Sequence, residues 1–379
     1  MDYTGVDIAL IGRKSSCKTY FLKAASADDL VDDALEARVW WTSSFAPNRA
    51  DLIQAPEHGF CPSGNRLLPA RLRHLTAADV AETEKERRGA ILLVLSADFI
   101  FHKGKPRAGG SGIHTAASRT KERLGLQVPF AIAVSVDMDE IGEQQVASTV
   151  KTFLTSVKED LAVEGIPVIA ITPRTELWLR EQVSEGGRVS YIPGGKQFRI
   201  PSAFETMMDR NAIAKARAAF DVCDGTGIVA AVSAAVALSP PTLVFPVGDF
   251  GTLQSLGWAG EGSPPAQLRT CRLLRASCTP RDVFEVEKKG GIYAGGDVTG
   301  AEAVPASADA DARAVPATIE LDAPIGPGAW AMRLTASQKA VKVWRVGEVA
   351  AGSRAKGDRP LASVQLGDLR SKERRRGRS

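Results

Sequence analysis

The segment Gly12–Thr19, which reads GRKSSCKT, constrains this chain more than any other part of the sequence. It follows the apolar run Val6–Ile11 and opens a stretch with helical spacing, Lys18–Ala25. This order of strand, glycine-led loop and helix is typical of the phosphate-binding pattern G-x-x-x-x-G-K-[ST]. In that pattern backbone N–H groups at a helix N-terminus surround a phosphate. The lysine of that pattern reaches the terminal phosphates and the hydroxyl holds magnesium. We therefore expect phosphate contacts from Gly12, Ser15, Ser16, Cys17, Lys18 and Thr19, with Thr19 also a ligand for Mg²⁺.

One position departs from the pattern, because Cys17 stands where the second glycine is expected. Its Cβ enters a turn that normally lies against the phosphate, so we expect weaker binding than a glycine would allow. The alternative is an ordinary strand-to-helix turn that happens to contain Lys-Thr. The order of strand, loop and helix favours the phosphate loop.

Short apolar runs alternate with amphipathic stretches through the first half of the chain, which is typical of a parallel sheet with helical crossovers. One amphipathic face runs from Val146 to Leu161. The pattern predicts an α/β fold, a P-loop NTPase three-layer sandwich with a mostly parallel sheet, followed by a C-terminal helical and β-rich extension. The expected strands are 6–11, 38–42, 50–54, 90–96, 129–134 and 167–171.

With its phosphate loop and this order of strands, the chain resembles the P-loop GTPases of the translation-factor and Ras-related superclass over about residues 5–185. Within that superclass it is most similar to the double-GTPase-like proteins of bacterial conflict and signalling gene clusters. The resemblance implies GTP and Mg²⁺ as cofactors.

In that family the third strand ends in D-x-x-G, whose Asp holds magnesium through water and whose Gly N–H senses the γ-phosphate. The matching place here is 51–59, DLIQAPEHG, where Gln54 replaces the Asp and Glu57 replaces the Gly. His58 falls where the family positions its attacking water, which makes it the candidate catalytic residue; a surface-loop histidine is the alternative. Thr42 is the candidate switch threonine for Mg²⁺, and an ordinary strand threonine explains it equally well.

The family's guanine-reading motif [NT]-K-x-D follows the strand 129–134, where this chain has Val136–Asp139. The resemblance assigns Asp139 to the guanine base. Asp137 replaces the lysine that packs over the base. The last family element, an S-A-K-like loop, corresponds to Thr172–Arg174.

The second half of the chain is less regular. The largely apolar stretch Ile228–Val247 is interrupted by prolines, which indicates a buried helix and a strand rather than a membrane span. We expect five parts: a GTPase-like P-loop domain at 1–185, a helical and Pro/Gly-rich extension at 186–300, a low-complexity linker at 301–317, a small β element at 318–350 and a basic disordered tail at 351–379.

Charge and cysteine usage bound the partners and the compartment. The net charge is +4, but residues 370–379 hold six basic residues and one acid, so the rest of the chain is close to neutral. This excludes a nucleic-acid-binding surface over the whole protein and leaves the tail as a candidate for binding nucleic acid or an acidic partner. The five cysteines show no zinc spacing, and MDYTGVDIAL lacks the pattern of a signal peptide, which together favour the cytoplasm.

Three functions remain open from the sequence. The first is a nucleotide-binding GTPase-like switch or scaffold, with GTP favoured over ATP and with weak or no hydrolysis. The second is a pseudo-GTPase that binds no nucleotide and acts as a protein-interaction module. The third is an active NTPase in which Asp51 or Asp98 replaces Gln54 as the magnesium ligand. In each case we expect a protein partner to bind the C-terminal half, and no membrane.

Overall fold

The structure is a computed structural model of the full chain. It describes residues 6–12, 17–26, 36–42, 67–74, 90–96, 99, 101–102, 105–106, 111–124, 129–137, 144–184, 187–192, 195–251, 253, 255–256, 271–274, 277–289, 292–293, 295–306 and 315–337.

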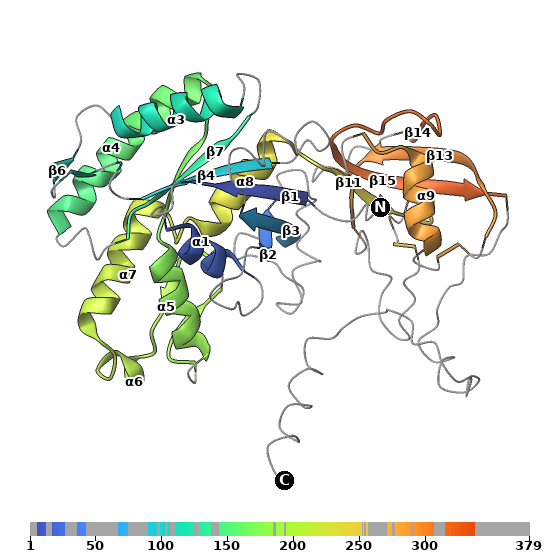
Figure 1. The fold of residues 1–379 in the computed structure, drawn as a ribbon. Helices are drawn as coiled ribbons and strands as arrows, with labels where there is room; N and C mark the ends of the chain where they lie inside the picture. The colour runs from blue at the N-terminus through green and yellow to red at the C-terminus, as the bar shows by residue number, and fades with distance from the viewer. Residues whose placement is uncertain are drawn as a thin grey trace, which may run out of the picture.

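A six-stranded sheet forms the centre of the first half, as predicted for an α/β P-loop sandwich (Figure 1). Every pairing in it is parallel except that of β2 with β3. The strands β1 and β4 lie side by side in the middle of the sheet. Every side chain of β4 is buried, which explains its continuous apolar sequence, and Ile8, Leu10 and Ile11 of β1 are buried as well. In order across the sheet the strands are β2 (Glu36–Thr42), β3 (Leu67–His74), β1 (Val6–Ile11), β4 (Ala90–Leu95), β7 (Ala131–Ser135) and β8 (Val168–Ile171).

Helices cover both faces of this sheet and complete the three layers (Figure 1). Because successive strand side chains point to opposite faces, Ile91 and Leu93 join one apolar cluster while Leu92 and Val94 join the other. The first cluster contains α3 (Ser111–Leu124), α4 (Gln144–Val163) and α7 (Arg210–Cys223); the second contains α1 (Lys18–Ala25) and α8 (Ile228–Leu238). The helix α5 (Pro173–Ser184) packs beside α1.

The second half builds a separate five-stranded mixed sheet. Its order, with the first and last strands parallel at the centre, is that of a β-grasp fold, and α9 (Pro280–Lys289) covers one face. The strands in order are β12 (Arg272–Leu274), β11 (Thr242–Pro246), β15 (Gly328–Ala336), β13 (Val298–Pro305) and β14 (Ala317–Thr318). Small elements complete the described chain: β5 (Phe101–His102), β6 (Lys105–Pro106), β9 (Ser190–Tyr191), β10 (Phe198–Arg199) and α6 (Ser202–Glu205).

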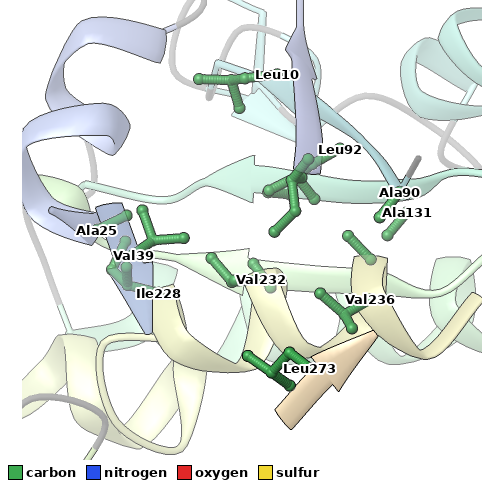
Figure 2. Close-up of a cluster of buried hydrophobic side chains, with 14 of the residues drawn as sticks. Leu10, Ala25, Val39, Ala90, Leu92, Ala131, Ile228, Val232, Val236 and Leu273 are labelled. Atoms are coloured by element: carbon green, nitrogen blue, oxygen red, sulfur yellow. The ribbon is translucent and has the colours of Figure 1, made fainter. Parts of the chain in front are cut away.

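The helix α8 lies between the two sheets and joins them in one core. Its residues Ile228, Val232 and Val236 pack in the same cluster as Leu92 of the large sheet and Leu273 of the small one (Figure 2). Its buried residues follow helical spacing along one face, whereas Ala230 and Ala237 are exposed. The buried residues are Ile228, Ala231, Val232, Ala235 and Val236.

The stretch 210–238 is long and apolar enough to cross a membrane by composition alone. It is, however, two helices, because α7 ends at Asp224, whose φ is 54°, and α8 starts after Gly227, whose φ is 73°. The buried face of α8 packs in the core, which explains the apolar residues on that face. The expectation of a buried helix followed by a strand is confirmed for Ile228–Leu238 and Thr242–Pro246.

Two expectations about the second half differ from the structure. Part of the expected linker 301–317 is the strand β13, whose small alanine side chains pack under α9. The expected small β element at 318–350 is not separate, because β15 pairs with β11 on one side and β13 on the other. Residues 338–350 and the tail 351–379 lie outside the described residues.

Candidate functional site

The two ends of the predicted phosphate loop meet at the carboxyl end of β1. Gly12 leaves the strand with φ 153°, and Cys17 enters α1 in the left-handed conformation, with φ 58° and ψ 15°. The Lys18 ammonium donates a hydrogen bond back to the Gly12 carbonyl. Gly12, Cys17, Lys18 and Thr19 are therefore brought together as predicted. Ser15 and Ser16 lie outside the described residues.

The conformation of Cys17 explains why the pattern has a glycine at this position. A left-handed backbone is accessible to glycine without cost and is unfavourable for a residue with a Cβ. The Cys17 carbonyl accepts the first helical hydrogen bond, from the Phe21 amide at 2.9 Å. Phe21 is fully buried and fixes the start of α1 against the sheet. The backbone of Cys17 thus has the left-handed conformation that glycine favours.

Lys18 and Thr19 differ in exposure. Lys18 is half-buried, and the burial lowers the pKa of its ammonium below the usual lysine value. Thr19 is exposed on the first turn of α1, where its hydroxyl is accessible to a ligand. A cation and a hydroxyl at the N-terminus of a helix suit an anion such as a phosphate.

The neighbouring strand β3 corrects the placement of the magnesium acid. The strand expected at 50–54 would have put Gln54 at the acid position, but the strand that pairs with β1 in parallel is Leu67–His74. His74 is opposite Leu10 at its carboxyl end, so a histidine stands where the family has an Asp. Residues 51–59 precede this strand, which removes the positional argument for His58; that residue itself lies outside the described residues.

The assignment of Thr42 as a magnesium ligand is wrong. Thr42 pairs with Leu67 at the amino end of β3, whereas the phosphate loop lies at the other end of the sheet, beyond His74. The eight residues of β3 separate the two ends by roughly 20 Å at the usual rise of a strand. Thr42 cannot reach a metal bound at Thr19.

The predicted base-binding side of the site lies at the end of β7. Asp137, two residues after this strand, provides a carboxylate there. Its side chain is buried, with 6% exposed. It accepts hydrogen bonds from the Ser135 hydroxyl at 3.3 Å and from the Arg174 backbone N–H at 3.2 Å. The Arg174 Nε lies 3.7 Å from its second oxygen. Asp139, the predicted guanine ligand, lies outside the described residues.

Arg174 joins this base side to the phosphate loop. Its guanidinium lies over the ring of Tyr20, 5.0 Å from the centroid, and Tyr20 is on the first turn of α1. The sequence pattern placed Arg174 at the end of the S-A-K-like loop but did not predict Tyr20 as a site residue. The aromatic residue Tyr20 directly after Lys18-Thr19 could have indicated a stacking position, but its partner Arg174 lies far away in the sequence.

A buried network holds α5, and with it Arg174, in place. Glu176 has 1% of its surface exposed and accepts hydrogen bonds from Arg180 Nε at 2.9 Å and from the hydroxyls of Tyr191 and Thr226, both at 2.6 Å. Arg180 also donates to the carbonyl of Ser26, directly after α1. The loop after β8 is therefore fixed relative to the phosphate-loop helix.

A cavity of about 280 Å³ lies between α5 and α7 beside Arg174. Two carboxylates, two cations and one indole line it together with small residues. The lining residues are Asp137, Arg174, Thr175, Trp178, Asp209, Ala212, Lys215 and Ala216.

Comparison with known proteins agrees with this architecture. The family model described as "Obg-like GTPase YGR210-like, G4 motif-containing domain" matches residues 147–249, from α4 to the end of β11. That match and the parallel sheet together show a GTPase-like α/β domain. No curated protein matches the chain.

Several solved structures are similar at low identity. A GTP-binding protein from Pyrococcus horikoshii OT3 is 15% identical, with 87% of this chain and 100% of that chain covered and a TM-score of 0.46. A bacterial selenocysteine-specific elongation factor EF-Sec is 11% identical over 48% of this chain and 28% of that one, with a TM-score of 0.26. A mutation variant of SsGBP is 14% identical over 48% of this chain and 55% of that one, with a TM-score of 0.27.

Proposed function

We propose that this protein binds a guanine nucleotide through the loop Gly12–Thr19 and acts as a switch or scaffold with weak or no hydrolysis. The observation that carries the proposal is the geometry of the loop ends. Cys17 keeps the left-handed turn, and Lys18 reaches across to Gly12. The match to an Obg-like GTPase model supports GTP as the nucleotide.

Weak hydrolysis follows from the residues around the loop. Mg²⁺ prefers oxygen ligands, and among the described residues at this edge of the sheet Thr19 has a hydroxyl while β3 ends in His74. Within the described ranges no cluster of three His, Cys, Asp or Glu side chains is suited to a metal. These residues fit a resident Mg²⁺ poorly, so we derive no metal-assisted step.

A specific observation favours a second candidate, the pseudo-GTPase interaction module. The Asp137 carboxylate and the Arg174 guanidinium pair with each other, and Arg174 also covers Tyr20. Groups that face a nucleotide base in a GTPase are thus engaged within the protein. We rank this candidate second because nothing in an interaction module requires Lys18 to be positioned at the loop.

Other expected roles rest on the sequence alone. Asp51 and Asp98, the acids of the active-NTPase alternative, lie outside the described residues, as does the basic tail 370–379. A protein partner for the second half, a bacterial conflict or signalling system and a cytoplasmic location stay predictions.

The test is equilibrium binding of fluorescent GDP and GTP to the full chain and to two variants of α1. We expect Lys18→Ala to lose at least tenfold in affinity, because a charge-assisted contact to phosphate is removed. Lys23→Ala, on the same helix but in its last turn, is the matched control and should bind like the wild type. Single-turnover GTP hydrolysis by the wild type should be slow, and no faster with Mg²⁺ than without.

Two results would count against the proposal. Absence of saturable binding at millimolar nucleotide would favour the interaction module. Magnesium-dependent turnover at the rate of an ordinary GTPase would favour the active-NTPase alternative.

A further inference from the structure

From the contacts of Arg174 we infer that this side chain fills the base side of the site, so that the loop binds chiefly the polyphosphate and prefers guanine over adenine only weakly. The inference rests on the proposed function, because it concerns the ligand of the same loop.

The position of Arg174 follows from the sheet. In open α/β sheets, ligands bind at the carboxyl ends of the strands. A nucleotide whose phosphates lie at the end of β1 extends over the ends of β4, β7 and β8, which follow β1 in the sheet order. The loop after β8 contains Arg174, and its contact with Tyr20 places it against the first turn of α1. A base attached to phosphates on this turn therefore meets the pair Arg174–Tyr20.

Three contacts hold Arg174 there. Its backbone N–H and its Nε both face the buried Asp137 carboxylate, at 3.2 Å and 3.7 Å, and its guanidinium covers the Tyr20 ring. A planar cation over an aromatic ring has the shape and stacking preference of a bound base. The carboxylate that faces it is engaged with the cation and not with a base N–H group.

Binding of a base then requires free energy to displace Arg174, whereas binding of phosphate does not. The base must displace the guanidinium from Tyr20 and separate it from Asp137, although both contacts are about half-exposed at the arginine. Each contact is individually weak, and their loss offsets most of what stacking of the base would contribute. The phosphates need only the loop ends and Lys18.

The experiment compares GDP, ADP and inorganic pyrophosphate by calorimetric titration of the full chain. For the wild type we expect dissociation constants within about fivefold of one another, since the base adds little. Arg174→Ala should tighten GDP binding by about tenfold and leave pyrophosphate within about twofold, because releasing one exposed ion pair and one cation–π contact has this size. The hydrogen bond from the backbone N–H of residue 174 to Asp137 does not involve the side chain, so Arg174→Ala retains it.

Arg217→Ala is the matched control, since Arg217 is an exposed arginine of α7 that pairs with Glu205 and does not line the cavity. It should match the wild type with all three ligands. A wild type that binds GDP more than about a hundredfold more tightly than ADP would overturn the inference and leave the proposed function intact. So would a loss of GDP affinity in Arg174→Ala, which would make Arg174 a ligand of the base. Failure of all three ligands to bind would instead refute the proposed function.

Discussion

Lys18 donates a hydrogen bond to the carbonyl of Gly12, six residues earlier, and so joins the two ends of the loop between β1 and α1. This contact places an ammonium at the N-terminus of a helix, where backbone N–H groups already favour an anion. The ammonium has three N–H donors, so it can keep this contact and still donate to a phosphate. The affinity of the loop is therefore linked to the charge of Lys18.

That link predicts a dependence on pH. Burial lowers the pKa of Lys18, so the ammonium loses its proton at a pH below the usual lysine value. Binding needs the charged form, so GDP affinity should fall as the pH rises from about 7 to about 10. Lys18→Arg, which stays charged, should show a smaller fall in the same titrations. A wild-type affinity that is constant over this range would contradict the role of Lys18.

The Cβ of Cys17 in this left-handed turn predicts that Cys17→Gly tightens GDP binding. Removal of the Cβ lets the backbone approach a phosphate more closely, and we expect a gain of about fivefold, which is roughly 1 kcal/mol. Cys17→Ala keeps the Cβ and removes the sulfur, so it should not tighten binding. If the alanine variant gained as much as the glycine variant, the thiol and not the turn would be the obstacle.

Gly227 should tolerate no side chain. A Cβ there would lie 1.9 Å from the carbonyl oxygen of Ala170, and its φ is 73°. Gly187 has a φ of 70° with nothing within 4 Å of its Cβ position, so Gly187→Ala isolates the backbone strain. We expect Gly227→Ala to lose about 3 kcal/mol or more in the free energy of unfolding and Gly187→Ala about 1 kcal/mol. Denaturant unfolding measures both, and equal losses would show that α8 has room to move from β8.

Two arginines of the second half, Arg272 in β12 and Arg281 in α9, test the effect of burial on an ion pair. Arg272 pairs with Glu287, which is fully buried, whereas Arg281 pairs with the exposed Asp322. Arg272→Ala leaves a buried carboxylate without its cation and should cost about 3 kcal/mol. Arg281→Ala should change the free energy of unfolding little, because exposed pairs contribute little. A small effect of both substitutions would mean that water enters around Glu287.

The site could be predicted from the sequence where its residues are contiguous. Gly12, Lys18 and Thr19 fall within one short segment between a strand and a helix, so their spacing alone indicated the loop. The strand β3 was missed because Pro69, Arg71 and Arg73 interrupt its apolar pattern. The family's magnesium-binding acid follows the strand that pairs with β1. Because β3 was not predicted as that strand, Gln54 and His58 were assigned to the wrong positions.

Contacts between distant segments gave no such signal. Arg174 meets Tyr20 and Asp137 only after β1, β7 and β8 are assembled, and no periodicity relates these positions. The small sheet was divided for a similar reason. Its central strands β11 and β15 pair with each other although the rest of this sheet and α9 lie between them in the sequence. The alanines of β13 resemble a linker in the sequence, and only their packing under α9 identifies a strand.

Hydrogen–deuterium exchange of the full chain, with and without saturating GDP, tests most directly whether this loop binds phosphate. We predict that protection increases in the peptide spanning Gly12–Ala25, which covers the loop and α1, and that Lys18→Ala abolishes the increase. Unchanged exchange of this peptide in the presence of bound GDP would place the nucleotide elsewhere and contradict the proposed site.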